Sequence, residues 1–473
     1  MEQRSKFTIR TSDRRVFRRC LRKWSFQSSL KGNWKRKGTE QNINFWFGSA
    51  IHFSMEDYHG YNHFGDPRRA FWAYYQSFPK EELPLGADAM YETGIAMLSY
   101  YLTWYARHND VTGFQTAWVN PETHEISKEH IEGYEPSVEQ SFMIPLNIIA
   151  VTDKDDNIVD VIYAKDGLKE TTTKYEQYIH LCDGNFYPYE TYDGKIGQYQ
   201  FIPICYHGTM DRIVVDKYGR FWILDYKTAK GADTNKLATD DQISAYLWAF
   251  EKWFGIKPYG FIYLQLTKEA VQEPKRLKDG TLSVDKRQKT TYSLVKQEIL
   301  NDYGAVNKAP NKIIDFLNHM ASIETPEGDK FIRWDFVKRT AEEIEATEHH
   351  IYAEVHQMLN PDLEYYISPT RDCIWDCPVR DWCLATDRKD QPAIDQFMLE
   401  YEKRPRDEDG NIEPWRENIP WPDKINPDAN EPYGLVPLED ILALDEAMKI
   451  EMSLDSEDDN TGFKFMYESD RED

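Results

Sequence analysis

Two apolar runs joined by a short turn form the most regular pattern in the chain. Residues 206–216 and 220–228 are rich in β-branched and aromatic side chains, and the turn between them at 217–219 contains a glycine. Strand-forming residues on both sides of a short turn predict a β-hairpin.

Further elements follow from the same kind of periodicity. We expect helices at 45–58, 89–106 and 241–250, strands around 139–149, 198–205 and 259–266, and a charged helical region at 331–356. Residues 268–292 form a Lys-rich excursion after the strand at 259–266 and are expected to be a loop close to a nucleic acid.

Charged side chains gather at one end of the predicted hairpin. Asp225 and Lys227 are two residues apart, so they leave the same face of the strand while Tyr226 points to the other. Asp211, in the first strand, can reach the same end. Two carboxylates and a lysine suit a hard divalent cation that holds a phosphodiester and a water molecule, with the ammonium group stabilising charge on phosphorus. The alternative is a solvated, charged strand edge.

Composition places the chain among globular proteins. Its 473 residues exceed one ordinary domain, and aromatic residues make up 14%. No run approaches the length of an apolar membrane span and the N-terminus has no apolar signal region, so a cytoplasmic protein without a membrane partner is expected. Six cysteines in so long a chain argue against a disulfide framework. No phosphate-binding Gly-x-x-x-x-Gly-Lys loop is present, which excludes a helicase of that type.

The net charge of -24 is unevenly distributed. Residues 1–40 contain 13 Lys and Arg against 3 Asp and Glu, whereas residues 391–473 contain 8 against 24. Basic and aromatic residues alternate at 14–26, a pattern that suits a DNA strand, with cations on phosphates and rings stacked on bases. The alternative is a surface helix with its rings packed inward.

Two other patterns contain metal-binding residue types. In the helix at 45–58, Gly48, His52 and Glu56 follow one another at intervals of four residues, although a lone histidine on an apolar helix is usually structural. Near the C-terminus, Cys373, Cys377 and Cys383 form a triplet without a fourth ligand, and Cys20 is the most economical candidate for that ligand. Four thiolates suit either zinc or an iron–sulfur cluster.

The hairpin motifs resemble those of the RecB-like branch of the PD-(D/E)xK nuclease superfamily. That branch is marked by Gly-x-x-Asp-Arg, Asp-x-Lys-Thr and Gln-x-x-x-Tyr, which stand here at 208–212, 225–228 and 242–246. Its Gly-x-x-x-His-x-x-x-Glu helix matches residues 48–56. The resemblance implies an α/β fold with a restriction-endonuclease-like core, in which helices flank a central mixed sheet, and a helical region that holds the cysteines.

The same resemblance implies a DNA exonuclease that depends on Mg²⁺ or Mn²⁺ and acts on single-stranded or unwound ends. Its metal ligands would be His52, Asp211, Asp225 and the main-chain carbonyl of Tyr226. Lys227 would orient the attacking water or stabilise the transition state. The remaining site residues it implies, which contact the substrate or support the site, are Gln242 and Tyr246, and Glu56 would be a supporting residue.

The cysteines resemble those of AddB-type helicase-nucleases and of CRISPR-associated spacer-acquisition exonucleases. In those proteins one early cysteine and a late triplet bind a 4Fe–4S cluster, which implies that role for Cys20, Cys373, Cys377 and Cys383. The gap of three residues between Cys373 and Cys377 is longer than the family's commonest gap, and zinc remains the alternative. The resemblance also favours a stand-alone enzyme of phage or mobile-element origin.

We therefore expect three parts: a basic N-terminal arm at 1–40, a nuclease domain at 41–390, and an acidic, Pro-rich tail at 391–473 with one amphipathic helix at 436–452. The tail is expected either to be solvated, or to compete with DNA or bind a protein partner. Two other functions stay open: a structure-specific endonuclease with the same site, and a non-catalytic DNA-binding or assembly protein on a nuclease fold.

Overall fold

The computed structural model describes residues 7–37, 42–155, 157–164, 174–231, 234–324, 328–375, 377–404 and 437–438. Its strands are β1 (Phe7–Ile9), β2 (Trp34–Arg36), β3 (Gln115–Thr116), β4 (Trp118–Val119), β5 (Ile126–Ser127), β6 (Glu135–Pro136), β7 (Val138–Thr152), β8 (Ile158–Tyr163), β9 (Phe186–Glu190), β10 (Ile196–Val215), β11 (Phe221–Ala229), β12 (Gly260–Thr267), β13 (Ile332–Val337) and β14 (Tyr401–Lys403).

Its α-helices are α1 (Thr11–Arg19), α2 (Leu21–Gln27), α3 (Ile43–Glu56), α4 (Pro67–Gln76), α5 (Ala87–Thr112), α6 (Lys174–Tyr178), α7 (Asp241–Phe254), α8 (Tyr292–Tyr303), α9 (Asn311–Ile323), α10 (Ala341–Leu359), α11 (Asp372–Trp375), α12 (Arg380–Arg388) and α13 (Gln391–Met398). The short helices are η1 (Asp57–Tyr61), η2 (Ile179–Leu181), η3 (Leu237–Thr239) and η4 (Val306–Lys308). None of the helices in the described ranges is long and apolar enough to cross a membrane.

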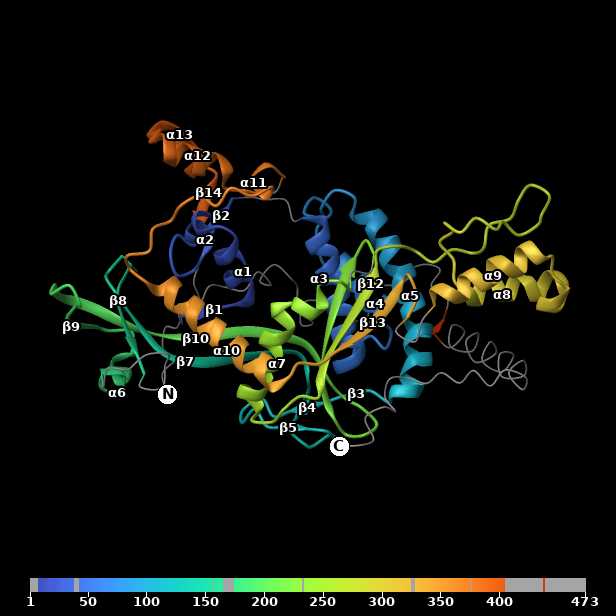
Figure 1. Ribbon diagram of the computed structural model, residues 1–473, viewed down its shortest axis with the longest axis horizontal. Helices are drawn as coiled ribbons and strands as arrows, with labels where there is room; N and C mark the ends of the chain where they lie inside the picture. The colour runs from blue at the N-terminus through green and yellow to red at the C-terminus, as the bar shows by residue number, and fades with distance from the viewer. Residues whose placement is uncertain are drawn as a thin grey trace.

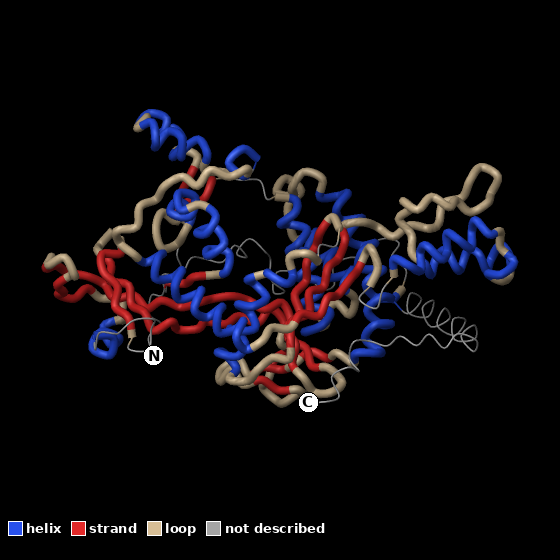
Figure 2. Tube along the Cα trace, viewed as in Figure 1, coloured by secondary structure: helices blue, strands red, loops and turns tan. Residues whose placement is uncertain are grey.

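One large mixed sheet organises the molecule (Figure 2). Among the described residues it has nine strands, with β13-β12-β11-β10-β7-β8 as its main path and β1, β3 and β9 paired to β10. The pairs β11–β12 and β1–β10 are parallel and the others are antiparallel. This mixed sheet flanked by helices confirms the expected α/β fold class.

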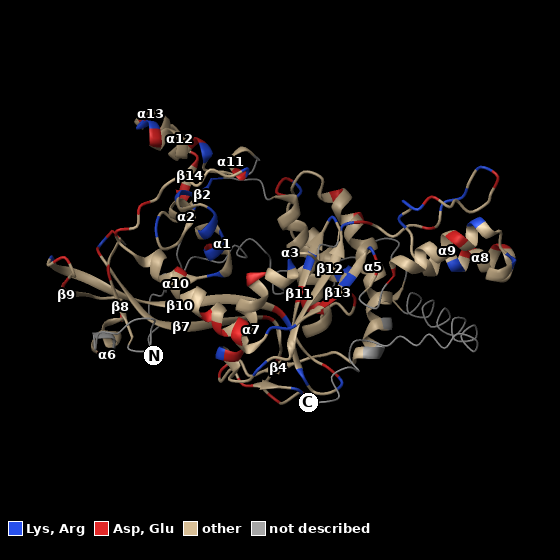
Figure 3. Ribbon diagram, in the orientation of Figure 1, with Lys and Arg blue, Asp and Glu red and all other residues tan. Residues whose placement is uncertain are grey.

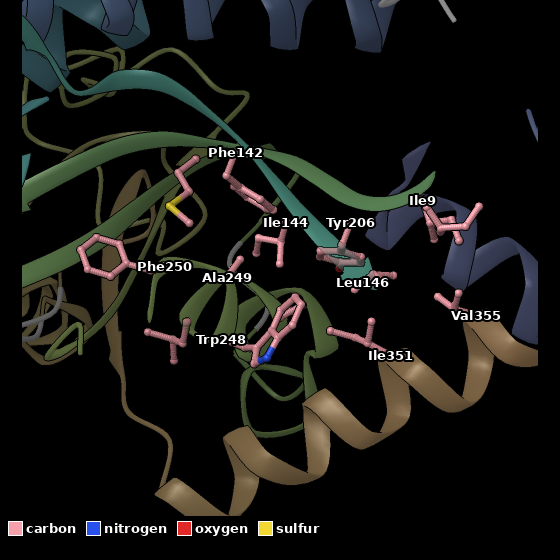
Figure 4. Packing of buried hydrophobic residues seen from close by; sticks show 14 of the residues in the cluster. Ile9, Phe142, Ile144, Leu146, Tyr206, Trp248, Ala249, Phe250, Ile351 and Val355 are labelled. Carbon is pink, nitrogen blue, oxygen red and sulfur yellow. The ribbon is translucent and has the colours of Figure 1, made fainter. Parts of the chain in front are cut away.

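Helices cover both faces of the sheet (Figure 1). Trp222, Leu224 and Tyr226 of β11 share a buried cluster with residues of α3, α4 and α5, whereas Ile223 belongs to a cluster with residues of α7 and α10. Figure 4 shows that second cluster, in which strands β7 and β10 face α7 and α10. Because side chains alternate along a strand, Asp225 and Lys227 leave β11 on the α7 side.

The hairpin, the helix before it and the helix after it form as expected. β10 ends at Val215, β11 begins at Phe221, and the two pair in an antiparallel register between them. The expected helices at 45–58 and 241–250 correspond to α3 and α7, and the strand at 259–266 corresponds to β12.

The charged helical region expected at 331–356 is wrong in its first part, where β13 occupies residues 332–337 and pairs with β12. The residues of this segment pair with β12 along an extended strand and do not form one buried face of a helix. The residues between β12 and β13 include α8 and α9, which pack around a small core of their own that contains Leu282, Val295 and Phe316. The main sheet therefore continues beyond β12 with β13.

Of the two alternatives for the aromatic residues at 14–26, the structure favours rings packed inward over rings stacked on DNA bases. Phe17, Trp24 and Phe26 are at most 5% exposed and pack inside the protein. β1, just before this segment, pairs with β10 and joins the N-terminal region to the main sheet. These rings stabilise the core of the protein and are not accessible to a ligand.

The two ends of the described chain meet. β2 pairs with β14, and Phe26, Val379 and Tyr401 form a small buried cluster between them. The folded chain thus continues past residue 390 through α13 and β14. The helix expected at 436–452 lies outside the described residues apart from 437 and 438, as does the rest of the acidic tail beyond 404.

Candidate metal and nuclease site

Three elements bring potential metal ligands together: α3 carries His52, β7 carries Glu139 and β10 carries Asp211. The ligand atoms of these residues all lie within 4.8 Å of one another. Nδ1 of His52 is 3.4 Å from Oε1 of Glu139 and 3.5 Å from Oδ2 of Asp211. Among the described residues, this is the one group of histidine, cysteine and acidic side chains that meets this criterion.

The main chain of Tyr226 lies against the same group. Its carbonyl oxygen is 3.1 Å from Nε2 of His52, and its N–H donates to Oδ2 of Asp211 at 2.8 Å. A ring nitrogen facing a carbonyl oxygen must carry a proton, while the other ring nitrogen faces two carboxylates. His52 is therefore placed as an imidazolium that donates on both sides, and a cation that binds one ring nitrogen would replace the proton on that nitrogen.

Asp225 and Lys227 complete the cluster on β11. The Lys227 Nζ and Asp225 Oδ2 atoms are 2.6 Å apart, and Asp225 is only 1% exposed. Apart from this ion pair, neither carboxylate oxygen of Asp225 has a hydrogen-bond partner among the described residues. A buried carboxylate with free lone pairs is costly unless a cation satisfies it.

Burial and neighbouring charge shift the pKa values of the site in opposite directions. Burial alone would lower the pKa of His52, but the charge of Asp211 and the hydrogen bond to Glu139 outweigh it and raise that pKa to about 9. Burial raises the pKa of Asp211 to about 7, and the charges of Asp225 and Glu139 act in the same direction. Burial would also lower the pKa of Lys227, but the charge of Asp225 outweighs it, so the ammonium form persists.

Helix α7 brings the two remaining expected residues to the site. Tyr246 is half-buried, and its pKa is raised first by burial and then by the charge of Asp225. Gln242, one turn earlier, hydrogen-bonds to Tyr246 and is also half-buried. The structure therefore places both beside the Asp225–Lys227 pair, on the face of the sheet that α7 covers.

Arg212 supports the site from the opposite face of β10. It is 2% exposed, donates to Oγ1 of Thr116 at 3.0 Å, and lies over the ring of Tyr105. Burial raises the pKa of Tyr226 to about 12, and the positive charge of Arg212 acts in the opposite direction. The arginine of the Gly-x-x-Asp-Arg motif thus lies near the side chain of the residue whose carbonyl faces His52.

Sequence reasoning missed Glu139. Its side chain is 5% exposed and its φ is +47°, a backbone conformation that is uncommon for a residue other than glycine and that often marks functional sites. The one available signal was an acidic residue at the start of an otherwise apolar strand. Glu56, expected to be a supporting residue, is buried on α3 and does not belong to the described ligand group.

The four cysteines come near one another without forming a compact ligand group. Burial raises the pKa of Cys383 to about 11, and the charges of Cys20 and Cys377 contribute to that rise. Burial likewise raises the pKa of Cys377, with contributions from Cys373 and Cys20. The cysteines are therefore close enough for the charge of one to affect the pKa of another. No three of them, however, have sulfur atoms that all lie within 4.8 Å of one another, as the ligand atoms of the His52 group do.

Protein contacts also connect the segment that contains Cys20 to the segment that contains the cysteine triplet. Arg19 pairs with Asp372, and Arg22 Nη1 lies 3.0 Å from Asp387 Oδ1. These ion pairs and the β2–β14 pairing connect the ends through the protein itself.

The donor set at the main site fits a divalent cation. Carboxylates, a neutral imidazole and a main-chain carbonyl are ligands that Mg²⁺ and Mn²⁺ accept. The buried carboxylate of Asp225, whose partner among the described residues is Lys227, and the convergence of Asp211 and Glu139 on His52 are the structural reasons for this assignment.

Comparison with known proteins agrees with this geometry. A family model described as the PD-(D/E)XK nuclease superfamily matches residues 11–384, a range that includes all the site residues discussed above. None of the curated proteins compared with the chain matches it.

Proposed function

The chain belongs to the PD-(D/E)XK nuclease superfamily, and from this premise we propose that it is a DNA exonuclease that degrades single-stranded ends with Mg²⁺ or Mn²⁺. Metal-dependent nuclease activity follows from the family. The substrate, the mode of cleavage and the choice of cation are the parts that we add.

One observation carries the proposal. Asp211, Asp225 and Lys227 converge at one end of the β10–β11 hairpin, with His52 of α3 facing the main chain of Tyr226. This arrangement combines hard oxygen ligands with one fixed cationic side chain. Such a combination suits hydrolysis of a phosphodiester.

The protein residues have separate roles in this reaction. His52, Asp211, Asp225 and the Tyr226 carbonyl would hold the cation, which supplies Lewis-acid polarisation of the phosphate and activation of water. Lys227 stays protonated beside Asp225, so we assign it to stabilising negative charge that develops on the phosphate rather than to removing a proton. Gln242 and Tyr246 would contact the substrate beside this pair.

The test compares two topologies of the same DNA. End-labelled linear single strands and single-stranded circles are incubated with the protein and Mg²⁺ or Mn²⁺, beside reactions that contain EDTA. An exonuclease degrades the linear strand to short products, leaves the circle intact and is silent in EDTA. Cut circles identify a structure-specific or other endonuclease instead. If wild-type protein supplied with Mg²⁺ or Mn²⁺ cleaves neither the linear nor the circular DNA, the nuclease proposal is wrong.

We further propose that Cys20, Cys373, Cys377 and Cys383 bind a structural 4Fe–4S cluster. The support for this proposal is the resemblance of the cysteine pattern. The electrostatic effect of Cys20 on both Cys377 and Cys383 is compatible with a centre that these cysteines share.

Metal analysis of anaerobically purified protein tests the cluster. We expect about four iron atoms per chain, a brown colour, and loss of both in Cys373→Ala and Cys20→Ala. Cys182→Ala, at a buried cysteine outside this set, serves as the control and should keep its iron. Stoichiometric zinc without iron overturns the cluster, and full iron content in Cys20→Ala excludes Cys20 as the fourth ligand.

A further inference from the structure

Helix α3 is buried on all sides except for one stripe. From Trp46 to Glu56 its residues are buried except for Gly48 and His52. One turn before Gly48, Phe45 is also exposed. Because residues three, four and seven positions apart share a helix face, Phe45, Gly48 and His52 form a single stripe along the helix.

The stripe leads from solvent to the metal ligands. His52 stands at its inner end beside Asp211 and the Tyr226 carbonyl. A Cβ atom placed on Gly48 would meet only Oγ1 of Thr228, at 3.8 Å, so the middle of the stripe is open. An elongated ligand can therefore lie along this face and reach the site.

Phe45 is an unusual residue to leave at the outer end. Its side chain is 72% exposed, although it belongs to a helix that buries nearly all its other apolar residues. Exposing a phenylalanine gives up the free energy that its burial would contribute. A flat ring facing solvent beside a nuclease site is suited to stacking on an unpaired base.

Two lysines lie beside the same end of α3. Lys268 follows β12, its N–H donates to the carbonyl of Ala229 at 2.7 Å, and its Nζ donates to Oδ1 of Asn44 at 3.0 Å. Lys230, which follows β11, is exposed. The hydrogen bond of Lys268 to Ala229, the residue before Lys230, brings the two lysines near each other. Burial lowers the pKa of Lys268, and the charge of Lys230 lowers it further. Positive charge next to an exposed ring suits a nucleic-acid strand.

We propose that Phe45 stacks on an unpaired base of the DNA strand that enters the site along α3, and that Lys230 and Lys268 contact phosphates of that strand. This inference rests on the proposed nuclease function and specifies how the enzyme selects a single strand. Phe45 and His52 are seven residues apart on one helix, roughly 10 Å, so the stacked base lies near the scissile phosphate. In a duplex that base would be paired and could not stack on the ring.

The first experiment measures binding separately from cleavage. Affinity for a labelled single strand and for the matching duplex is determined in EDTA by fluorescence anisotropy, using wild type, Phe45→Leu, Phe45→Tyr and Phe45→Trp. Loss of stacking should weaken single-strand binding of Phe45→Leu about tenfold. Phe45→Tyr and Phe45→Trp should bind like wild type because they keep a ring, and duplex binding should not change.

The control is Phe186→Leu, at another exposed ring, on β9 at the far end of the sheet from α3 (Figure 1). It should bind single strands like wild type. Unchanged single-strand affinity in Phe45→Leu overturns the inference, as does an equal loss for single strand and duplex. Failure of Phe45→Tyr and Phe45→Trp to restore affinity also overturns it, because stacking requires only an aromatic ring.

The second experiment tests the lysines through salt dependence. Each phosphate contact that is lost should reduce the slope of log affinity against log salt concentration by about 0.7 for a single strand. Lys230→Gln and Lys268→Gln should each show this reduction. Lys217→Gln, at the far end of the β10–β11 hairpin, should keep the wild-type slope. Wild-type slopes in both Lys230→Gln and Lys268→Gln contradict the phosphate contacts.

These measurements distinguish the inference from the proposed function. Absence of cleavage by wild type in Mg²⁺ and Mn²⁺ contradicts the nuclease proposal even if Phe45 binds DNA as described. Normal cleavage together with unchanged binding by Phe45→Leu contradicts the stacking inference alone.

Discussion

At the scale of single residues, the buried Asp225–Lys227 pair makes the sharpest prediction. Asp225→Ala and Lys227→Ala should each lower the cleavage rate by about 10²–10³ while leaving DNA affinity nearly unchanged. Asp225 is expected to hold the cation, and Lys227 to meet charge that develops during attack. Most binding energy comes instead from phosphate contacts spread over a wider surface.

The matched control is Lys217→Ala, which removes an exposed lysine from the turn of the same hairpin. Single-turnover cleavage and anisotropy are measured for all three variants. Rates like wild type in Asp225→Ala and Lys227→Ala would falsify the assignment of the site.

The protons on His52 and Asp211 predict that cation binding depends on pH. A cation replaces the protons held by His52, whose pKa is raised to about 9, and by Asp211, whose pKa is raised to about 7. Because both pKa values are raised, His52 is protonated and Asp211 is partly protonated near pH 7 in the metal-free protein, and both groups lose their protons as pH rises. Apparent Mn²⁺ affinity should therefore increase from pH 6 to about 9, by about tenfold per unit over part of that range.

Calorimetric titration in two buffers with different ionisation enthalpies measures the protons released. At pH 7.5 we expect release of about one proton per cation. Release should be smaller in His52→Gln. An affinity that stays constant over this pH range argues against His52 as a ligand.

The sequence identified most candidate residues because they lie in local patterns. Asp225, Lys227 and Tyr226 are adjacent, and a strand sends them to predictable sides. Glu139 could not be found in this way. Its position depends on β7 pairing with β10, in which Met210 pairs with Gln140, and such a long-range register is not visible in local spacing.

At the scale of elements, α1 is held to α7 and α10 by ion pairs rather than left free for DNA. Arg14 is fully buried, with its Nε 2.7 Å from Oε2 of Glu354 and its Nη1 3.3 Å from Oδ2 of Asp241. Figure 3 shows the acidic residues on α7. The basic character of this segment thus reflects internal pairing as well as surface charge.

Removal of Arg14 should destabilise the protein strongly. Arg14→Ala takes the buried guanidinium away from Asp241 and Glu354 and leaves them only the more exposed Arg18. We therefore expect a loss of about 3 kcal/mol in the free energy of unfolding. Arg15→Ala is the control, because Arg15 is 47% exposed and its pair with Asp240 should contribute less than about 1 kcal/mol. Urea denaturation of both variants checks this, and equal losses contradict it.

Local patterns explain which elements were predicted and which were not. α3 and α7 have helical periodicity within one continuous segment, and β10 and β11 are joined by a short turn, so neighbouring residues determine each. β13 is six residues long, and its pairing with β12 crosses the intervening α8–α9 unit. Nothing in its own six residues identifies that partner.

At the scale of the whole molecule, the packing of α13 and β14 sets where the chain can be shortened. Deleting residues 405–473 removes 21 acidic and 6 basic residues and none of the proposed site residues. Cleavage should persist, and DNA binding should tighten most at low salt, where repulsion is least screened. Deleting 391–473 also removes Tyr401 and exposes Phe26.

Thermal unfolding and cleavage by the two truncated proteins check this prediction. The longer deletion should lower the melting temperature, whereas the shorter one should not. Loss of cleavage in a folded protein that ends at residue 404 assigns the tail to the active enzyme.

The pairing of β2 with β14 also constrains how the protein is made. Arg36 pairs with Tyr401, so a ribosome that adds about 5–20 residues per second completes the second strand roughly 20–70 s after the first. During that interval Phe26 lacks Trp382, Phe397 and Tyr401, the rings that surround it in the finished protein. The segment that contains Phe26 can therefore complete its packing only after the later strand has been made, and until then the nascent chain exposes aromatic surface.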